Sequence, residues 1–98
     1  MPCELSEKAA DDLDVIYELG SDRFGDRQAN RFFAELKDTL ELIGESPRLC
    51  YERKEYDPPV RIQVHENHLI IYIIREESVV ILRIVHGDCD WQSDFPED

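Results

Sequence analysis

The sequence predicts an α+β fold in which a helix hairpin packs on a mainly antiparallel sheet. Two apolar runs, residues 69–74 and 79–85, flank a charged break at residues 75–78, which is typical of adjacent buried strands. Apolar and polar residues alternate over residues 60–65, as in a strand with one buried face. In the first half, apolar residues recur at helical spacing. One domain, residues 1–98, accounts for these elements, with a core over about 4–92 and a loose acidic tail over 93–98.

The composition limits the classes of function. The chain has 98 residues, enough for one modest core, and its 23 Asp and Glu residues outnumber 11 Lys and Arg, for a net charge of -12. A field this negative repels phosphate backbones and disfavours direct nucleic-acid binding, although a local basic patch could survive inside an acidic shell. The sequence has no signal peptide, membrane-spanning run or metal-type cysteine spacing. We therefore expect a cytoplasmic protein with reduced thiols, no metal and no cofactor.

The first helix is predicted to begin after Ser6, whose hydroxyl can accept a hydrogen bond from a free N–H of the first turn. Glu7, Asp11 and Asp12 lie favourably near the positive end of this helix. Gly20 falls on its apolar face, so it either ends the helix or permits the close approach of a second helix, and we favour close approach with some local fraying. That face consists of Ala9, Leu13, Ile16, Tyr17, Gly20 and Phe24.

A second helix is predicted after Gly25, with Asp26 as its cap and Gly44 as its stop. Because only residues 24–26 join the two helices, we expect an antiparallel hairpin. Three prolines and mixed charge over residues 45–59 predict an irregular connection to the sheet. The apolar residues of the second helix form the cleanest helical stripe in the chain: Ala29, Phe32, Phe33, Leu36, Leu40 and Ile43.

The alternation over residues 60–65 assigns the two faces of that strand. Glu66-Asn67 is the predicted tight turn after it, since Asn tolerates positive φ. Residues 2–5 can add at most a short strand. We expect the apolar residues of the strand to face the helices and the polar residues to face away: Val60, Ile62 and Val64 inward, Arg61, Gln63 and His65 outward.

Strand pairing predicts a row of side chains across the sheet. If Glu66-Asn67 closes a two-residue hairpin, His65 opposes His68 and Arg61 lies opposite Tyr72. If Glu77-Ser78 closes the next hairpin, Tyr72 opposes Arg83. Arg61, Tyr72 and Arg83 would then form one row on the face away from the helices. Such a row could bind a phosphate, a carboxylate or a peptide, or its guanidinium groups could be solvated or paired with nearby carboxylates.

A histidine and a tryptophan follow the last predicted strand, with two interpretations each. His86 can act as a general acid or base, or it can be hydrogen-bonded in the turn that ends the strand. Trp91 can pack as an anchor over the end of the sheet or stay exposed as a contact. The sequence contains no phosphate-binding loop, dinucleotide fingerprint, nucleophile elbow or zinc-ligand set.

Several short motifs resemble ParE-type toxins of the RelE/ParE superfamily, in the same order and spacing. Leu5-Ser6, with the alanines and Asp12-Leu13 that follow, resembles the family's opening, and Phe24-Gly25 resembles its helix joint. These matches cover residues 5–91. The remaining ones are Pro47-Arg48-Leu49, Arg53, Val60-Arg61, residues 68–72, Arg83-Ile84-Val85-His86-Gly87 and Asp90-Trp91.

The resemblance implies a β-α-α-β-β-β order and the toxin half of a type II toxin–antitoxin pair. The ParE branch is associated with poisoning DNA gyrase, and the RelE branch with cleaving mRNA on the ribosome. A ParD-like antitoxin would hold the toxin inactive in a hetero-oligomer by wrapping it with its C-terminal segment. This chain has Asp88-Cys89 where ParE-like chains commonly have two arginines, and it is acidic where the family is usually basic. The antitoxin would then be unusually basic or bind through apolar contacts, or toxicity would be lost.

Two non-enzymatic functions are consistent with these features. One is an inhibitor that binds gyrase and is neutralised by its antitoxin, and the other is a binding module without toxicity. Partner contacts would come from the predicted row and its surroundings: Arg53, Arg61, Tyr72, Arg83, His86 and Trp91.

An mRNA endonuclease is the enzymatic alternative. Cleavage needs cations for the developing phosphorane charge and groups that move protons. Arg61 and Arg83 could supply the cations, aided by Arg53 or Lys54. Tyr72 or His86 could move the protons, while Asp88 and Asp90 would oppose the approach of RNA.

Overall fold

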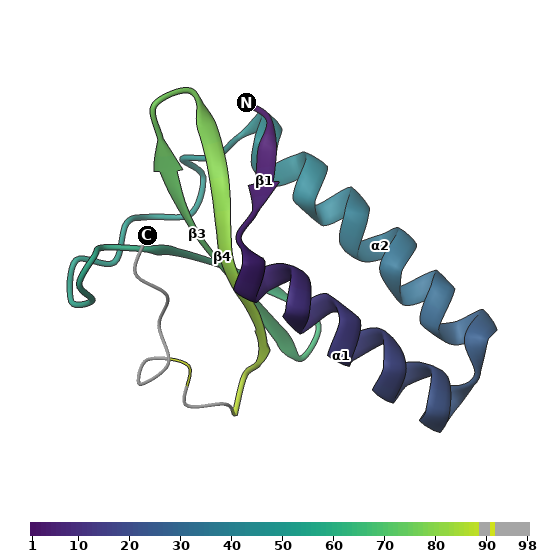
Figure 1. Ribbon diagram of the computed structural model, residues 1–98. Helices are drawn as coiled ribbons and strands as arrows, with labels where there is room; N and C mark the ends of the chain where they lie inside the picture. The colour runs from purple at the N-terminus through teal and green to yellow at the C-terminus, as the bar shows by residue number, and fades with distance from the viewer. Residues whose placement is uncertain (89–90, 92–98) are drawn as a thin grey trace.

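The computed structural model describes residues 1–88 and residue 91. Its elements are β1 (Cys3–Leu5), α1 (Glu7–Phe24), α2 (Asp26–Glu45), β2 (Arg61–His65), β3 (His68–Arg75) and β4 (Ser78–His86). The strands form one sheet in the order β1-β4-β3-β2, with β1 parallel to β4 and the other neighbours antiparallel. Figure 1 shows α1 and α2 side by side as a hairpin against one side of this sheet. The predicted α+β fold and the order β-α-α-β-β-β are confirmed.

The helix boundaries follow from local capping. The Ser6 hydroxyl accepts the Ala9 N–H at 3.0 Å, which confirms Ser6 as the N-cap of α1. The joint differs from the prediction, because Gly25, with φ of 90°, is the N-cap of α2 and Asp26 is its first residue. The Asp26 carboxylate instead accepts a hydrogen bond from the Ser21 hydroxyl. Neither described helix is long and apolar enough to span a membrane.

The prediction that Gly44 stops α2 is wrong, because Gly44 lies inside the helix. The helix continues to Glu45 and ends at the C-cap Ser46. The reason for glycine is the close approach of the N-terminus, whose amino group donates to the Gly44 carbonyl at 2.8 Å. A Cβ at this position would lie 2.6 Å from the Met1 carbonyl oxygen. At Gly20 a side chain could be accommodated, since a Cβ there would lie 3.8 Å from the Ala29 Cβ, which is an ordinary van der Waals contact.

Both faces of the sheet are covered, which reverses the predicted orientation of β2. The helix side is packed by Leu36 and Ile43 against strand residues such as Ile70. On the other side, Val60 and Ile62 join a second cluster with Tyr56 from the connection and with Trp91. The polar residues of β2 face the helix side, where each has a partner: Arg61 donates to the Cys50 carbonyl, Gln63 accepts from the Cys50 thiol, and His65 pairs with Thr39 of α2.

The predicted β2–β3 register is confirmed. The predicted β3–β4 register is wrong, because the turn between these strands lies one residue earlier than predicted. His65 pairs with His68 and Arg61 with Tyr72, as expected. The second turn consists of Glu76-Glu77 rather than Glu77-Ser78, because Glu76 adopts the positive φ of 54° that the turn requires. Tyr72 therefore opposes Ile81, and a register shift then brings Arg83 opposite Ile71.

We expect opposite effects from the same substitution at the two helical glycines. Gly20→Ala should stabilise the protein by up to about 1 kcal/mol through helix propensity alone. Gly44→Ala should destabilise it by about 1 kcal/mol, because displacing the Met1 backbone costs more than the propensity gained. Chemical denaturation of both variants, with an intact mass showing that Met1 is retained, measures the difference. Equal stabilisation by both would contradict the close contact of Met1 with α2.

Candidate functional site

The predicted row of Arg61, Tyr72 and Arg83 does not form. Tyr72 is 1% exposed in the cluster between helices and sheet, where its hydroxyl donates to the Pro47 carbonyl at 2.8 Å. Burial raises the pKa of the Tyr72 phenol far above its usual range, and the neighbouring Cys50 raises it further. Tyr72 is therefore a packing residue that stays protonated at neutral pH.

The remaining predicted residues lie in separate environments. Arg61 binds the Cys50 carbonyl, and the Arg53 guanidinium lies over the Tyr51 ring at 5.1 Å while its backbone pairs with Val60. Trp91 is 4% exposed and contacts the Tyr56 ring, which confirms its interpretation as a packing anchor.

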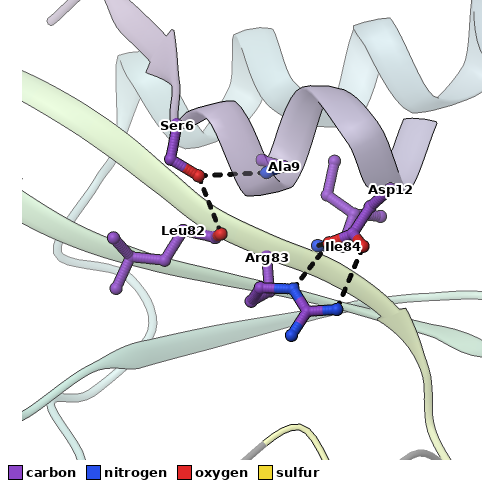
Figure 2. Close-up of polar contacts among 6 residues, drawn as sticks. All are labelled: Ser6, Ala9, Asp12, Leu82, Arg83 and Ile84. Carbon is purple, nitrogen blue, oxygen red and sulfur yellow. Dashed lines mark hydrogen bonds and ion pairs between the residues drawn. The ribbon is translucent and has the colours of Figure 1, made fainter. Parts of the chain in front are cut away.

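Arg83 is held by Asp12 at the edge of β4. The Arg83 Nε and Nη2 atoms donate to the two Asp12 oxygens at 2.8 and 3.0 Å, and the Ile84 N–H donates to Asp12 Oδ2 at 2.9 Å (Figure 2). The side chains of Arg83 and Asp12 are only 8% and 15% exposed. A little further back along the strand, the Ser6 hydroxyl donates to the Leu82 carbonyl at 2.9 Å. Asp12 thus binds the strand edge and the arginine at once.

Sequence reasoning placed Asp12 only near the helix dipole and missed this contact. A partial signal exists, because Asp12 precedes Leu13 of the inward helical face and so lies at the border of that face. An acidic residue there needs a cation or a free N–H on the sheet. Which strand supplies that partner depends on the tertiary arrangement.

Three histidines stand opposite one another on neighbouring strands, and we call them the histidine row: His65 on β2, His68 on β3 and His86 on β4. The His68 and His86 rings are 5.7 Å apart, and Phe32 of α2 contacts both the His65 and the His68 rings at 5.4 Å. His65 Nε2 and His68 Nδ1 are buried without a hydrogen-bond partner among the described residues. His86 is exposed, and its Nδ1 accepts the Asp88 N–H at 3.3 Å, as in a strand-end turn.

His68 is the central member of the row, between His65 and His86. Burial lowers the pKa of its imidazole, and the neighbouring His86 and His65 lower it further, against a smaller opposing influence of Glu66. Within the described residues, no group of three or more His, Cys, Asp or Glu side chains could hold a metal ion.

A groove of about 660 Å³ lies between the helix hairpin and the ends of β3 and β4. Its walls include three large apolar side chains that are exposed in the free chain: Val15, Leu19 and Phe24 are 54%, 49% and 63% exposed. His68 and His86 line the opposite wall, with Arg83 and Asp12 between. An apolar surface of this kind at a groove indicates a site for a partner.

Comparison with known proteins identifies the family. The family model described as "ParE toxin of type II toxin-antitoxin system, parDE" matches residues 3–91, which span every helix and strand. The chain belongs to the ParE toxin family. The protein "Toxin ParE1" of Caulobacter vibrioides is similar to this member of the family, with 31% identity over 85 residues that make up 87% of this chain and 88% of that one.

A solved structure shows the same fold at lower identity. It carries the description "Chromosomal ParDE TA system from P. aeruginosa" and has a TM-score of 0.76 and 23% identity, covering 88% of this chain and 95% of that chain. In this ParE family member, Asp88 is exposed just after the His86-Gly87 pair, and Cys89 and Asp90 lie outside the described residues.

We expect Asp12→Ala to destabilise the protein by about 3 kcal/mol, because it leaves the nearly buried Arg83 charge and the Ile84 N–H without their carboxylate. Asp11→Ala, one position earlier and exposed, is the matched control and should cost about 0.5 kcal/mol or less. Urea denaturation measures both. Adding Arg83→Leu to Asp12→Ala should recover part of the loss; equal stability of the two single variants would contradict this role.

His68 should make stability depend on pH. Because the folded pKa lies below 6.5, the unfolded chain binds a proton more readily. The contribution of neutral His68 is therefore complete above about pH 6.5 and is lost as the pH falls below that value. Thermal unfolding between about pH 7.5 and 5.5 should show a steeper loss for the wild type than for His68→Gln. Parallel curves would show that His68 is not linked to folding.

Proposed function

We propose that this chain is the toxin of a type II toxin–antitoxin pair, that it inhibits DNA gyrase by binding, and that a cognate ParD-like antitoxin neutralises it. The observation that carries the proposal is the family match across residues 3–91. The names of the Caulobacter relative and of the Pseudomonas ParDE system support it. The cytoplasm, where gyrase and its DNA are found, is the proposed location.

The positions of the residues considered for RNA cleavage favour the binding mechanism. Tyr72 is buried with a raised pKa, so it is a poor proton carrier at neutral pH. Arg83 is paired with Asp12, and Arg61 with the Cys50 carbonyl, so neither guanidinium is directed at a shared phosphate position. The exposed Asp88 adds repulsion for RNA next to His86.

The groove is the proposed antitoxin site. Val15, Leu19 and Phe24 offer an apolar surface that a helical or extended segment could bury. The hairpin that forms one wall carries eleven acidic and five basic residues over Glu7–Phe24 and Asp26–Glu45. Charge complementarity therefore favours a segment with apolar side chains in the groove and basic ones along its rim.

Asp88 favours a second candidate, a module that binds its antitoxin without toxicity. An acidic side chain stands, nearly fully exposed, where the resemblance leads us to expect an arginine. A target surface that recognises cations there would be repelled. Growth arrest on expression of this chain alone would exclude the candidate.

A gyrase assay tests the target. Purified protein should reduce supercoiling and accumulate cleaved linear plasmid, and both effects should disappear when the cognate antitoxin is added. Unaffected gyrase at micromolar protein would exclude the gyrase proposal. Intact RNA on translating ribosomes would in turn exclude the endonuclease.

Leu19→Asp should weaken antitoxin binding by at least about 100-fold, because it places an unpaired charge in the apolar groove. The free variant should stay folded, since Leu19 is half exposed. Leu49→Asp is the matched control, because Leu49 is 78% exposed on the connection after α2 and does not line the groove. Titration calorimetry against the co-purified antitoxin measures both; equal affinities would place the antitoxin elsewhere.

A further inference from the structure

The groove wall formed by the ends of β3 and β4 carries titratable histidines, and the helical wall carries none. His68 and His86 line the wall formed by the strands, whereas His65 lies behind them, 11% exposed in its side chain and packed on Thr39 and Phe32. Since the three stand opposite one another on adjacent strands, a proton on one disfavours a proton on the next. The row therefore takes up its protons in separate steps as the pH falls, and not as a unit.

We propose that the histidine row makes binding at the groove sensitive to pH, so that the antitoxin segment is held at neutral pH and released on acidification. This inference rests on the proposed function, which places that segment in the groove. It adds a mode of regulation to the site.

Burial by the partner is the first physical reason. His86 is 54% exposed in the free chain, and His68 is half-buried. An apolar segment that covers them removes water from both rings, and desolvation disfavours the charged imidazolium. His68 Nδ1 is already buried without a hydrogen-bond partner among the described residues, so a proton on that atom would find no acceptor there. Binding therefore requires neutral rings and becomes weaker as they take up protons.

The charges around the row are the second reason. Phe32 and Thr39, which contact the row from α2, do not titrate. The carboxylate of Asp12 binds Arg83. The exposed carboxylates of Glu66 and Asp88 lie 3.7 Å from His65 and His86, respectively. A partner that complements the acidic hairpin brings basic side chains, which imidazolium groups would repel. The charged and titratable groups facing the row are Asp12 and Arg23 from α1, Glu66 from the β2–β3 turn, Arg83 from β4 and Asp88 after it.

The test uses the full chain and its co-purified ParD-like antitoxin, titrated by calorimetry at about pH 7.5 and about pH 5.5. The affinity of the wild type should fall by about tenfold or more over this range. Buffers with different ionisation enthalpies should show protons released on binding at the lower pH. Circular dichroism at each pH shows whether the free chain is folded.

Three variants identify the groups responsible. His86→Gln should reduce the dependence on pH, and His68→Gln combined with His86→Gln should nearly remove it. His65→Gln is the matched control, because it removes a histidine of the same row that does not line the groove, and it should keep most of the dependence. His86 is exposed, so its variant remains informative if substitution of His68 impairs folding.

The outcomes separate the inference from the function on which it rests. Absence of binding at about pH 7.5, or binding that Leu19→Asp leaves unchanged, would overturn the groove as the antitoxin site and the inference with it. Binding that needs Leu19 but has equal affinity at both pH values, or becomes tighter on acidification, would overturn the inference alone. Tighter binding would mean that the partner presents a carboxylate to the row.

Discussion

The free edge of β4 is the constraint on which the arrangement of the helices depends. β1 pairs only with Val79 to Ile81, so the rest of this long strand would leave backbone groups exposed on that side. The chain covers them with the start of α1: the Ser6 N–H donates to the Ile81 carbonyl, the Ser6 hydroxyl to the Leu82 carbonyl, and Asp12 accepts from the Ile84 N–H. These contacts position α1 along the strand. Because α2 follows after a single residue, they position the hairpin and the groove beside it.

The groove exists because this edge is covered by a helix rather than by a longer β1. Beyond Asp12, the apolar residues Val15 and Leu19 of α1 are about half exposed and line the groove opposite residues of β4. Arg83 lines the same groove, and Asp12 neutralises it in a nearly buried position. A charged pair there separates the packed core from the apolar wall that remains available to a partner.

Local signals predicted the elements well and the orientation of the sheet poorly. The cap at Ser6, the apolar stripe through Leu36 and the apolar patterns of the strands are local signals, so they predicted both helices and β2, β3 and β4. The same signals allowed at most a short strand at β1, whose place in the order came from the family resemblance. Which side chains of β2 point towards the helices depends on what packs against each side of the sheet. Val60 packs against Tyr56 and Trp91, and packing against the helices would have buried it equally well. An alternating pattern does not distinguish between two buried faces.

The site was predicted less well for a related reason. A one-residue difference in the turn at Glu76 moved Arg83 away from Tyr72, which separated the predicted row. The correct register of His65 with His68 was predicted, but the alignment of His86 with them depends on the register shift near Tyr72. Val15 and Leu19 were visible as apolar residues outside the inward stripe of α1, and apolar residues flanking a complete stripe are a signal for a second contact surface.

Charge and apolar surface have different roles in the proposed pair. The acidic hairpin acts over about one Debye length, roughly 8 Å at physiological salt, so it affects the rate of encounter and the choice of partner. The apolar groove would act only on contact, where burial of apolar surface is the main source of affinity. A toxin whose surface charge is opposite to that usual in its family would repel acidic antitoxins before their segments reached the groove. The net charge of -12 would then favour a basic antitoxin over an acidic one, while the groove would keep an apolar binding mode.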